Sequence, residues 1–125
     1  MDELKLKQLQ YESDTWKRLL AFMMDENVHL KNWLSEILKQ RLDPTTTEEM
    51  ENFQNHFVKE DQLIGLLRHE LVELDKLLVR EIFEDGQLMK SVQKKLRQVR
   101  KNMIVSEREF RKLKSAFHSY LAENI

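Results

Sequence analysis

The sequence contains no cysteine, one proline and only two glycines in 125 residues. The lack of cysteine excludes a disulfide scaffold, a cysteine-based zinc site and a thiol nucleophile. A sheet protein of this size needs many turns, which are rich in glycine and proline, so their scarcity argues against β structure. The strongest apolar run, Leu19–Met24, is far shorter than the roughly 20 residues that span a bilayer. We therefore expect a helical, soluble, cytoplasmic protein with no membrane partner.

The chain does contain enough apolar sequence to build a core. Apolar residues make up 41 % of the chain and charged residues 34 %, with a formal net charge of −1. The apolar share argues against disorder. The near-zero net charge means that the molecule as a whole does not attract a polyanion. The length fits one domain over residues 1–125.

Two breaks divide the sequence into three long segments. Pro44 cannot continue a preceding helix, and residues 45–49 offer a Thr-x-x-Glu capping box in two overlapping registers. Gly86 can take the left-handed conformation that ends a helix. We predict helices near residues 2–41, 46–84 and 87–122. Connections this short imply an all-α fold, an antiparallel up-down-up three-helix bundle.

Each predicted helix carries core residues at alternating three- and four-residue spacing. In the first helix they are Leu6, Leu9, Ser13, Trp16, Leu20, Met23, Asn27, Leu30, Leu34 and Ile37. In the second they are Met50, Phe53, Phe57, Glu60, Ile64, Leu67, Leu71, Leu74, Leu78 and Glu81. In the third they are Met89, Val92, Leu96, Val99, Met103, Ser106, Phe110, Leu113, Phe117 and Tyr120. The pattern predicts coiled-coil-like packing around a shared core.

An alternative is that Gly86 only bends one continuous helix of about 75 residues. Continuing the heptad of the second helix predicts core positions at Leu88 and Lys95. The apolar stripe instead uses Met89 and Leu96. This shift by one residue favours a turn.

No residue pattern indicates catalysis or a bound metal. Glu26 and His29 have the spacing used in di-iron carboxylate bundles, but such sites need a second pair, and no other histidine supplies one. Both glycines are isolated, so there is no glycine-rich phosphate loop. We expect surface histidines, no cofactor and no metal, and an enzyme or metal-binding bundle is the least favoured function.

Charge is segregated between the second and third helices. Ten Lys or Arg residues lie between Lys90 and Lys114, whereas 11 acidic residues lie between Glu48 and Asp85. A basic helix is typical of a binder of nucleic acid or acidic protein. The candidate basic face comprises Lys94, Arg97, Lys101, Arg108 and Arg111. We favour pairing of these charges with the acidic helix, because the aromatic residues of the third helix lie on its core stripe and cannot stack on bases.

Asn27 and Glu60 are polar residues on otherwise apolar stripes. A single asparagine in such a core commonly fixes the register of the helices. Because the first turn centres near Pro44, residue i of the first helix faces about residue 88 − i of the second. Asn27 then faces the region of residue 61, where Glu60 is the nearest core position. We predict that Asn27 and Glu60 pair in a polar core layer.

A further set of apolar residues lies off the core stripes. The candidate interface residues are Val58, Gly65, Leu66, Val72, Val79, Ile104 and Val105. A heptad-spaced outer stripe suggests that another helix packs there. A glycine within a helix costs about 1 kcal/mol relative to alanine, and close helix approach would explain it. We predict one patch that forms a homodimer interface with a two-fold axis near Gly65.

The sequence therefore favours a non-catalytic helical interaction module, either a homodimer or a partner of another helical protein. The alternative is a binder of nucleic acid or acidic protein that uses the basic third helix. Association that survives high salt supports the first function, and binding that falls steeply with salt supports the second.

Overall fold

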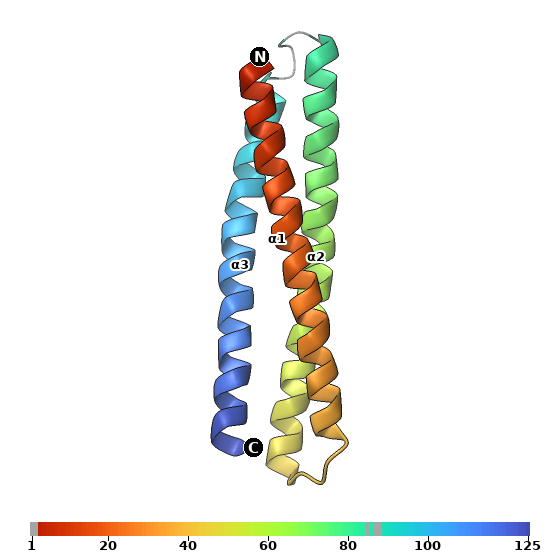
Figure 1. Cartoon of the computed structure of the whole chain (residues 1–125), viewed down its shortest axis with the longest axis vertical. Helices are drawn as coiled ribbons and strands as arrows, with labels where there is room; N and C mark the ends of the chain where they lie inside the picture. Colours follow the sequence, from red (N-terminus) through yellow and green to blue (C-terminus); the bar gives the residue numbers. More distant parts are fainter. Residues whose placement is uncertain (1–2, 85, 87–88) are drawn as a thin grey trace.

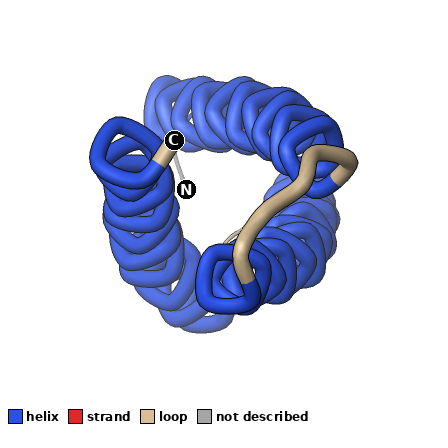
Figure 2. The backbone as a smooth tube through the Cα atoms, turned by 90° about the horizontal axis from the view of Figure 1, so that it is seen from below, coloured by secondary structure: helices blue, strands red, loops and turns tan. Residues whose placement is uncertain are grey.

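The computed structural model describes residues 3–84, 86 and 89–125. Its helices are α1 (Glu3–Leu38), α2 (Pro44–Glu84) and α3 (Met89–Asn124). Successive helices run antiparallel, so α1 begins and α3 ends at opposite ends of the molecule (Figure 1). Viewed along the long axis, the three helices surround a central core (Figure 2). The prediction of an all-α three-helix bundle is confirmed.

The first turn differs in detail from the prediction. α1 ends at Leu38 rather than near residue 41, and α2 begins at Pro44, where a missing amide hydrogen costs nothing. The helix cap is Asp43, whose Oδ1 accepts a hydrogen bond of 2.7 Å from the Thr46 amide. Hydrogen bonding to Thr46 lowers the pKa of the Asp43 carboxyl. The predicted capping box within residues 45–49 is therefore wrong.

Gly86 forms the second turn, as predicted. Its φ of 89° lies in the left-handed region that side chains disfavour. α3 begins at Met89, whose amide donates to the Gly86 carbonyl at 3.3 Å. The predicted start of this helix at residue 87 lies outside the described residues. The alternative of one continuous helix is excluded because α2 and α3 run in opposite directions (Figure 1).

One hydrophobic core runs along all three helices. Met23, Ile64 and Leu71 are each no more than 2 % exposed, and Leu96 and Phe110 are also buried. These positions confirm the heptad assignment. Five predicted stripe positions are only half-buried: Trp16, Phe53, Met89, Leu113 and Tyr120.

Trp16 was expected in the core but is only half-buried, at the edge of the cluster. Its indole is too large to be enclosed in a narrow three-helix seam, and tryptophan is rarely buried completely. The ring still packs against the core, so the position remains on the predicted stripe.

Aromatic rings concentrate at the end of the bundle near the first turn. The Phe117 ring centre lies 5.2 Å from those of Phe53 and Phe57 and 5.7 Å from that of Trp33. The edge-on geometry of these pairs is favourable. Because Trp33 belongs to α1 and Phe117 to α3, the contact closes the α1–α3 seam at this end.

Candidate functional site

The described residues form neither a metal site nor a membrane-spanning helix. Residues 3–84, 86 and 89–125 contain no group of three or more acidic or histidine side chains placed to hold a metal ion. None of the helices in these ranges is long and apolar enough to cross a membrane. All four histidines are exposed, as predicted. Glu26 and His29 do not act together, since His29 lies 3.7 Å from Asp25 and Glu26 pairs with Lys114 at 2.7 Å.

A polar cluster joins α1 to α2 at the middle of the bundle. The buried Asn27 donates from Nδ2 to Asp61 Oδ1 at 2.7 Å and to the Phe57 carbonyl at 2.9 Å. Lys31, one turn further along α1, forms an ion pair with the second carboxylate oxygen of Asp61. The cluster therefore provides acceptors for a buried amide and a counter-ion for the carboxylate.

The same arrangement occurs a second time, two heptads away on each helix. Ser13 Oγ donates to Asp75 Oδ1 at 2.7 Å, and Lys17 pairs with Oδ2. The hydrogen bond to Asp75 raises the pKa of Lys17. In both clusters the residue numbers of the polar core residue and its aspartate add up to 88, so the predicted α1–α2 register is correct.

Glu60 does not pair with Asn27, and this prediction is wrong. Glu60 is buried, and its Oε2 has no hydrogen-bond partner among the described residues. Successive helix residues point about 100° apart, so Asp61 faces α1 while Glu60 turns toward α3. Burial, reinforced by the negative charges of Glu109 and Asp61, raises the pKa of the Glu60 carboxyl.

Four of the seven candidate interface residues lie along one exposed line of α2. We call Val58, Gly65, Val72 and Val79 the valine face. The three valines are 44 %, 46 % and 49 % exposed in chain order. At Gly65, a Cβ atom would meet nothing within 4 Å. The valine face is therefore open, and no helix in the described part of the chain closely approaches this glycine.

Two residues of α1 extend the valine face, and the sequence analysis missed them. Met24, Val28 and Lys31 share one side of α1. Met24 Sδ lies 3.5 Å from Arg68 Nη1 of α2, and Lys31 pairs with Asp61. This side of α1 therefore borders α2, and it exposes 36 % of Met24 and 42 % of Val28. The α1–α2 register predicted from the first turn already places both residues near the level of Gly65, and it could have identified them from the sequence.

The other three candidate interface residues lie on different surfaces. Leu66 and Val105 help to line a groove of about 460 Å³ between α2 and α3. Ile104 does not line it and lies on the side of α3 that carries Arg97. The structure does not bring the seven residues into one patch, because sequence neighbours such as Gly65 and Leu66 point about 100° apart.

The basic residues that flank the core of α3 are paired across the helix seams. Lys95 pairs with Glu70 of α2. Arg100 makes two hydrogen bonds of 2.7 Å to Glu12 of α1, which raise the pKa of the arginine. The expected pairing with α2 thus accounts for Lys95, whereas the partner of Arg100 is a glutamate of α1.

The candidate basic face lies further out and is paired only in part. Arg108 and Arg111 have glutamate partners within α3, at 3.7 Å and 2.8 Å. Lys94, Arg97 and Lys101 are exposed and make no ion pair with any other residue of the described ranges. Pairing with the acidic helix therefore does not explain these three charges.

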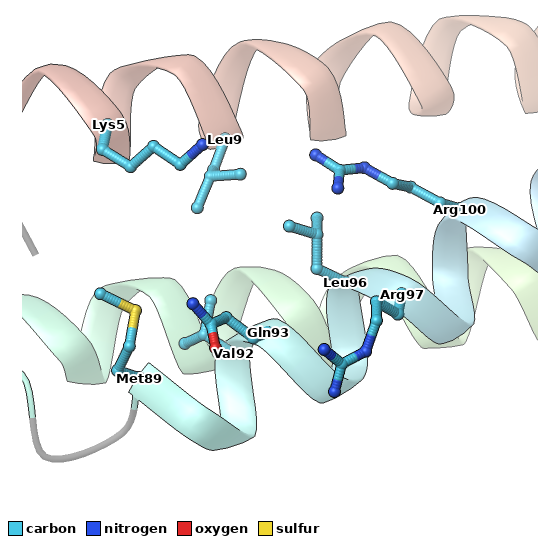
Figure 3. Close-up of a pocket in the computed structure, with 8 residues that line it drawn as sticks. All are labelled: Lys5, Leu9, Met89, Val92, Gln93, Leu96, Arg97 and Arg100. Carbon is cyan, nitrogen blue, oxygen red and sulfur yellow. The ribbon is translucent and has the colours of Figure 1, made fainter.

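Two adjoining hollows lie in the seam between α1 and α3, near the start of both helices. The first has a volume of about 370 Å³ and is lined by Lys5, Leu9, Met89, Val92, Gln93, Leu96, Arg97 and Arg100 (Figure 3). The second, of about 330 Å³, shares Lys5, Leu9 and Arg100 and also includes Tyr11. Tyr11 is 70 % exposed. An aromatic ring of α1 thus shares a hollow with one basic residue of α3, Arg100, which the sequence of α3 alone did not indicate.

Comparisons with protein-family models, with curated proteins and with solved structures found no match to this chain. Two surfaces on the described residues are suited to binding. The valine face is apolar, which favours association with another helix. The basic face and its neighbouring hollows favour an anionic partner.

Proposed function

We propose that this chain is a non-catalytic helical interaction module that associates with a second copy of itself through the valine face. The observation that carries the proposal is the open line of half-exposed valines around Gly65. A glycine in the middle of a 41-residue helix costs stability, and nothing in its own chain packs on it. Close approach of a partner helix would require a residue without a side chain here, which would explain the glycine.

The spacing of the valine face suits a second copy. Val58 and Val72 each lie seven residues from Gly65. A two-fold axis at Gly65 would place two α2 helices antiparallel, with Val58 of each copy against Val72 of the other. The two glycines would meet at the centre, where the absence of side chains lets the helix axes come close.

Charge at the rim is compatible with this antiparallel pair. Asp61 and Arg68 lie on the same side of the valine face, four residues before and three residues after Gly65. The two-fold axis would bring Asp61 of one copy to the level of Arg68 of the other. Such rim pairs contribute more to the choice of partner than to affinity. The proposal places the dimer in the cytoplasm, in keeping with a chain without cysteine.

Light scattering during size-exclusion chromatography tests the proposal. At tens of micromolar we expect a dimer that persists in high salt, because apolar contacts are not screened. Val72→Glu should give a folded monomer. Leu66→Glu is the matched control, because Leu66 is exposed in the groove between α2 and α3, outside the valine face, and the variant should remain dimeric.

Two outcomes contradict the proposal. One is a wild-type protein that is already monomeric at this concentration. The other is dissociation caused by Leu66→Glu but not by Val72→Glu, which would move the interface to the groove between α2 and α3.

A further inference from the structure

We propose that the outer side of α3, together with the adjoining α1–α3 hollows, binds single-stranded nucleic acid. Lys90, Lys94, Arg97 and Lys101 are spaced by four, three and four residues, so they share one side of the helix. The row is about 16 Å long. None of the four makes an ion pair with any residue that the structure describes.

This row destabilises the free protein. Lys90 and Lys94, like Arg97 and Lys101, are like charges four residues apart, which repel each other on a helix. α3 begins at Met89 with no acidic residue in its first turn, so Lys90 also lies at the positive end of the helix dipole. An external anion would relieve both effects.

The neighbouring residues show that the chain can pair such charges. Lys95 and Arg100, in the same three turns of α3, have Glu70 and Glu12 as partners. The four residues of the row therefore differ from Lys95 and Arg100 in having no acidic partner among the described residues. We infer that its counter-ions come from a bound partner.

Tyr11 decides between kinds of anion. It lies in the hollow that Arg100 also lines, and Arg97 belongs both to the basic row and to the wall of the adjoining hollow. A single strand offers phosphates for the lysines together with unpaired bases that stack on exposed aromatic rings. An acidic protein offers carboxylates but no bases spaced along a phosphate backbone, and a duplex hides the faces of its bases.

Fluorescence anisotropy with a labelled oligothymidylate of about 12 nucleotides tests the proposal on the full chain. Binding should weaken as salt rises from about 50 to 200 mM. Lys94→Gln with Lys101→Gln should weaken binding about tenfold or more and reduce the slope of log affinity against log salt by about 1.4, the contribution of two phosphate contacts.

The matched control is Lys39→Gln with Lys76→Gln. These exposed lysines have partners in Glu36 and Glu73, and their replacement changes net charge by the same amount. The control should leave the affinity and the salt slope unchanged. Equal losses in both double variants would show a response to net charge alone and would overturn the proposal. Circular dichroism and thermal unfolding should show that all variants are folded.

Tyr11→Ala distinguishes a nucleic acid from other polyanions. It should weaken oligothymidylate binding about tenfold, while Tyr11→Phe, which retains the ring, should restore it. Inorganic polyphosphate, which has no bases, should bind wild type and Tyr11→Ala equally. If oligothymidylate also binds both proteins equally, the ring is not a stacking platform and the surface recognises charge alone, which would overturn the assignment to single-stranded nucleic acid. No binding of the oligothymidylate at low salt would likewise overturn the proposal.

Discussion

Asn27 of α1 donates a hydrogen bond of 2.7 Å from its side-chain amide to the Asp61 carboxylate of α2. Fourteen residues earlier in α1, Ser13 makes the equivalent hydrogen bond to Asp75. In each cluster a polar core residue donates a hydrogen bond to an aspartate that remains partly exposed and is neutralised by a lysine. A shift of one helix by one heptad would break both clusters, so together they specify the register of α1 against α2.

The first prediction separates the hydrogen bond from the ion pair at Asp61. Asp61→Ala removes the acceptor of the buried Asn27 amide and should cost about 1–3 kcal/mol of unfolding free energy. Asp61→Asn retains an acceptor and loses the partly exposed ion pair with Lys31. It also removes a negative charge beside Glu60, so it should cost less than about 1 kcal/mol. Urea denaturation measures both. Equal losses would mean that the charge rather than the hydrogen bond stabilises the seam.

The second prediction concerns the core assignment on α2. Leu71 is 1 % exposed, and Leu71→Ala should lower the unfolding free energy by about 2–5 kcal/mol. The adjacent Val72 belongs to the valine face, so Val72→Ala should change it by less than about 0.5 kcal/mol in a monomeric background such as Val58→Glu. Similar losses at both positions would show that the two sides of α2 are misassigned.

The third prediction concerns pH and Glu60. Burial raises the pKa of this carboxyl above its ordinary value of 4.5, so the unfolded chain loses the proton at lower pH than the folded chain. Below pH 4.5 Glu60 is protonated in both states and does not reduce the unfolding free energy. As the pH rises toward and through the raised pKa of the folded chain, the unfolding free energy falls. Glu60→Leu removes this pH-dependent loss of unfolding free energy. It also removes a buried carboxylate oxygen that has no hydrogen-bond partner among the described residues.

At neutral pH we expect Glu60→Leu to be more stable than wild type by about 1–3 kcal/mol, and this advantage should shrink on acidification. Thermal or urea unfolding over a pH series measures the difference. Glu109→Gln is a milder variant in the same direction, because it removes a negative neighbour of Glu60. A gain that is constant with pH would show that Glu60 does not titrate abnormally.

Most of the fold followed from local patterns. Pro44 and Gly86 mark the two turns, and the heptad stripes identify the buried positions because both depend only on neighbours within one helix. The α1–α2 register also followed, since a short turn leaves little freedom. The partner of Asn27 was predicted wrongly because a core position, Glu60, was preferred to the register position, Asp61.

The surfaces were harder to predict because they depend on how each helix is rotated about its own axis. Gly65 and Leu66 are adjacent in the chain, yet Gly65 lies on the open valine face and Leu66 lines the groove with α3. The position of Tyr11 beside Arg100 depends on the parallel alignment of α1 and α3, which results from both turns together. That alignment is visible only in the structure, where Glu12–Arg100 and Glu26–Lys114 are offset by the same number of residues.

The last prediction uses Gly65 to separate folding from association. Because a Cβ atom at this position meets nothing within 4 Å, Gly65→Ala should stabilise the folded chain by about 1 kcal/mol through its higher helix propensity. The same methyl group would lie on the proposed two-fold axis and keep the two α2 helices apart. Gly65→Ala should therefore melt at higher temperature as a monomer and yet dimerise more weakly. The monomer measurement is made in the Val58→Glu background, and dimerisation is measured by sedimentation equilibrium in the otherwise native chain. A variant that dimerises as tightly as wild type would show that the helices do not approach closely at this glycine.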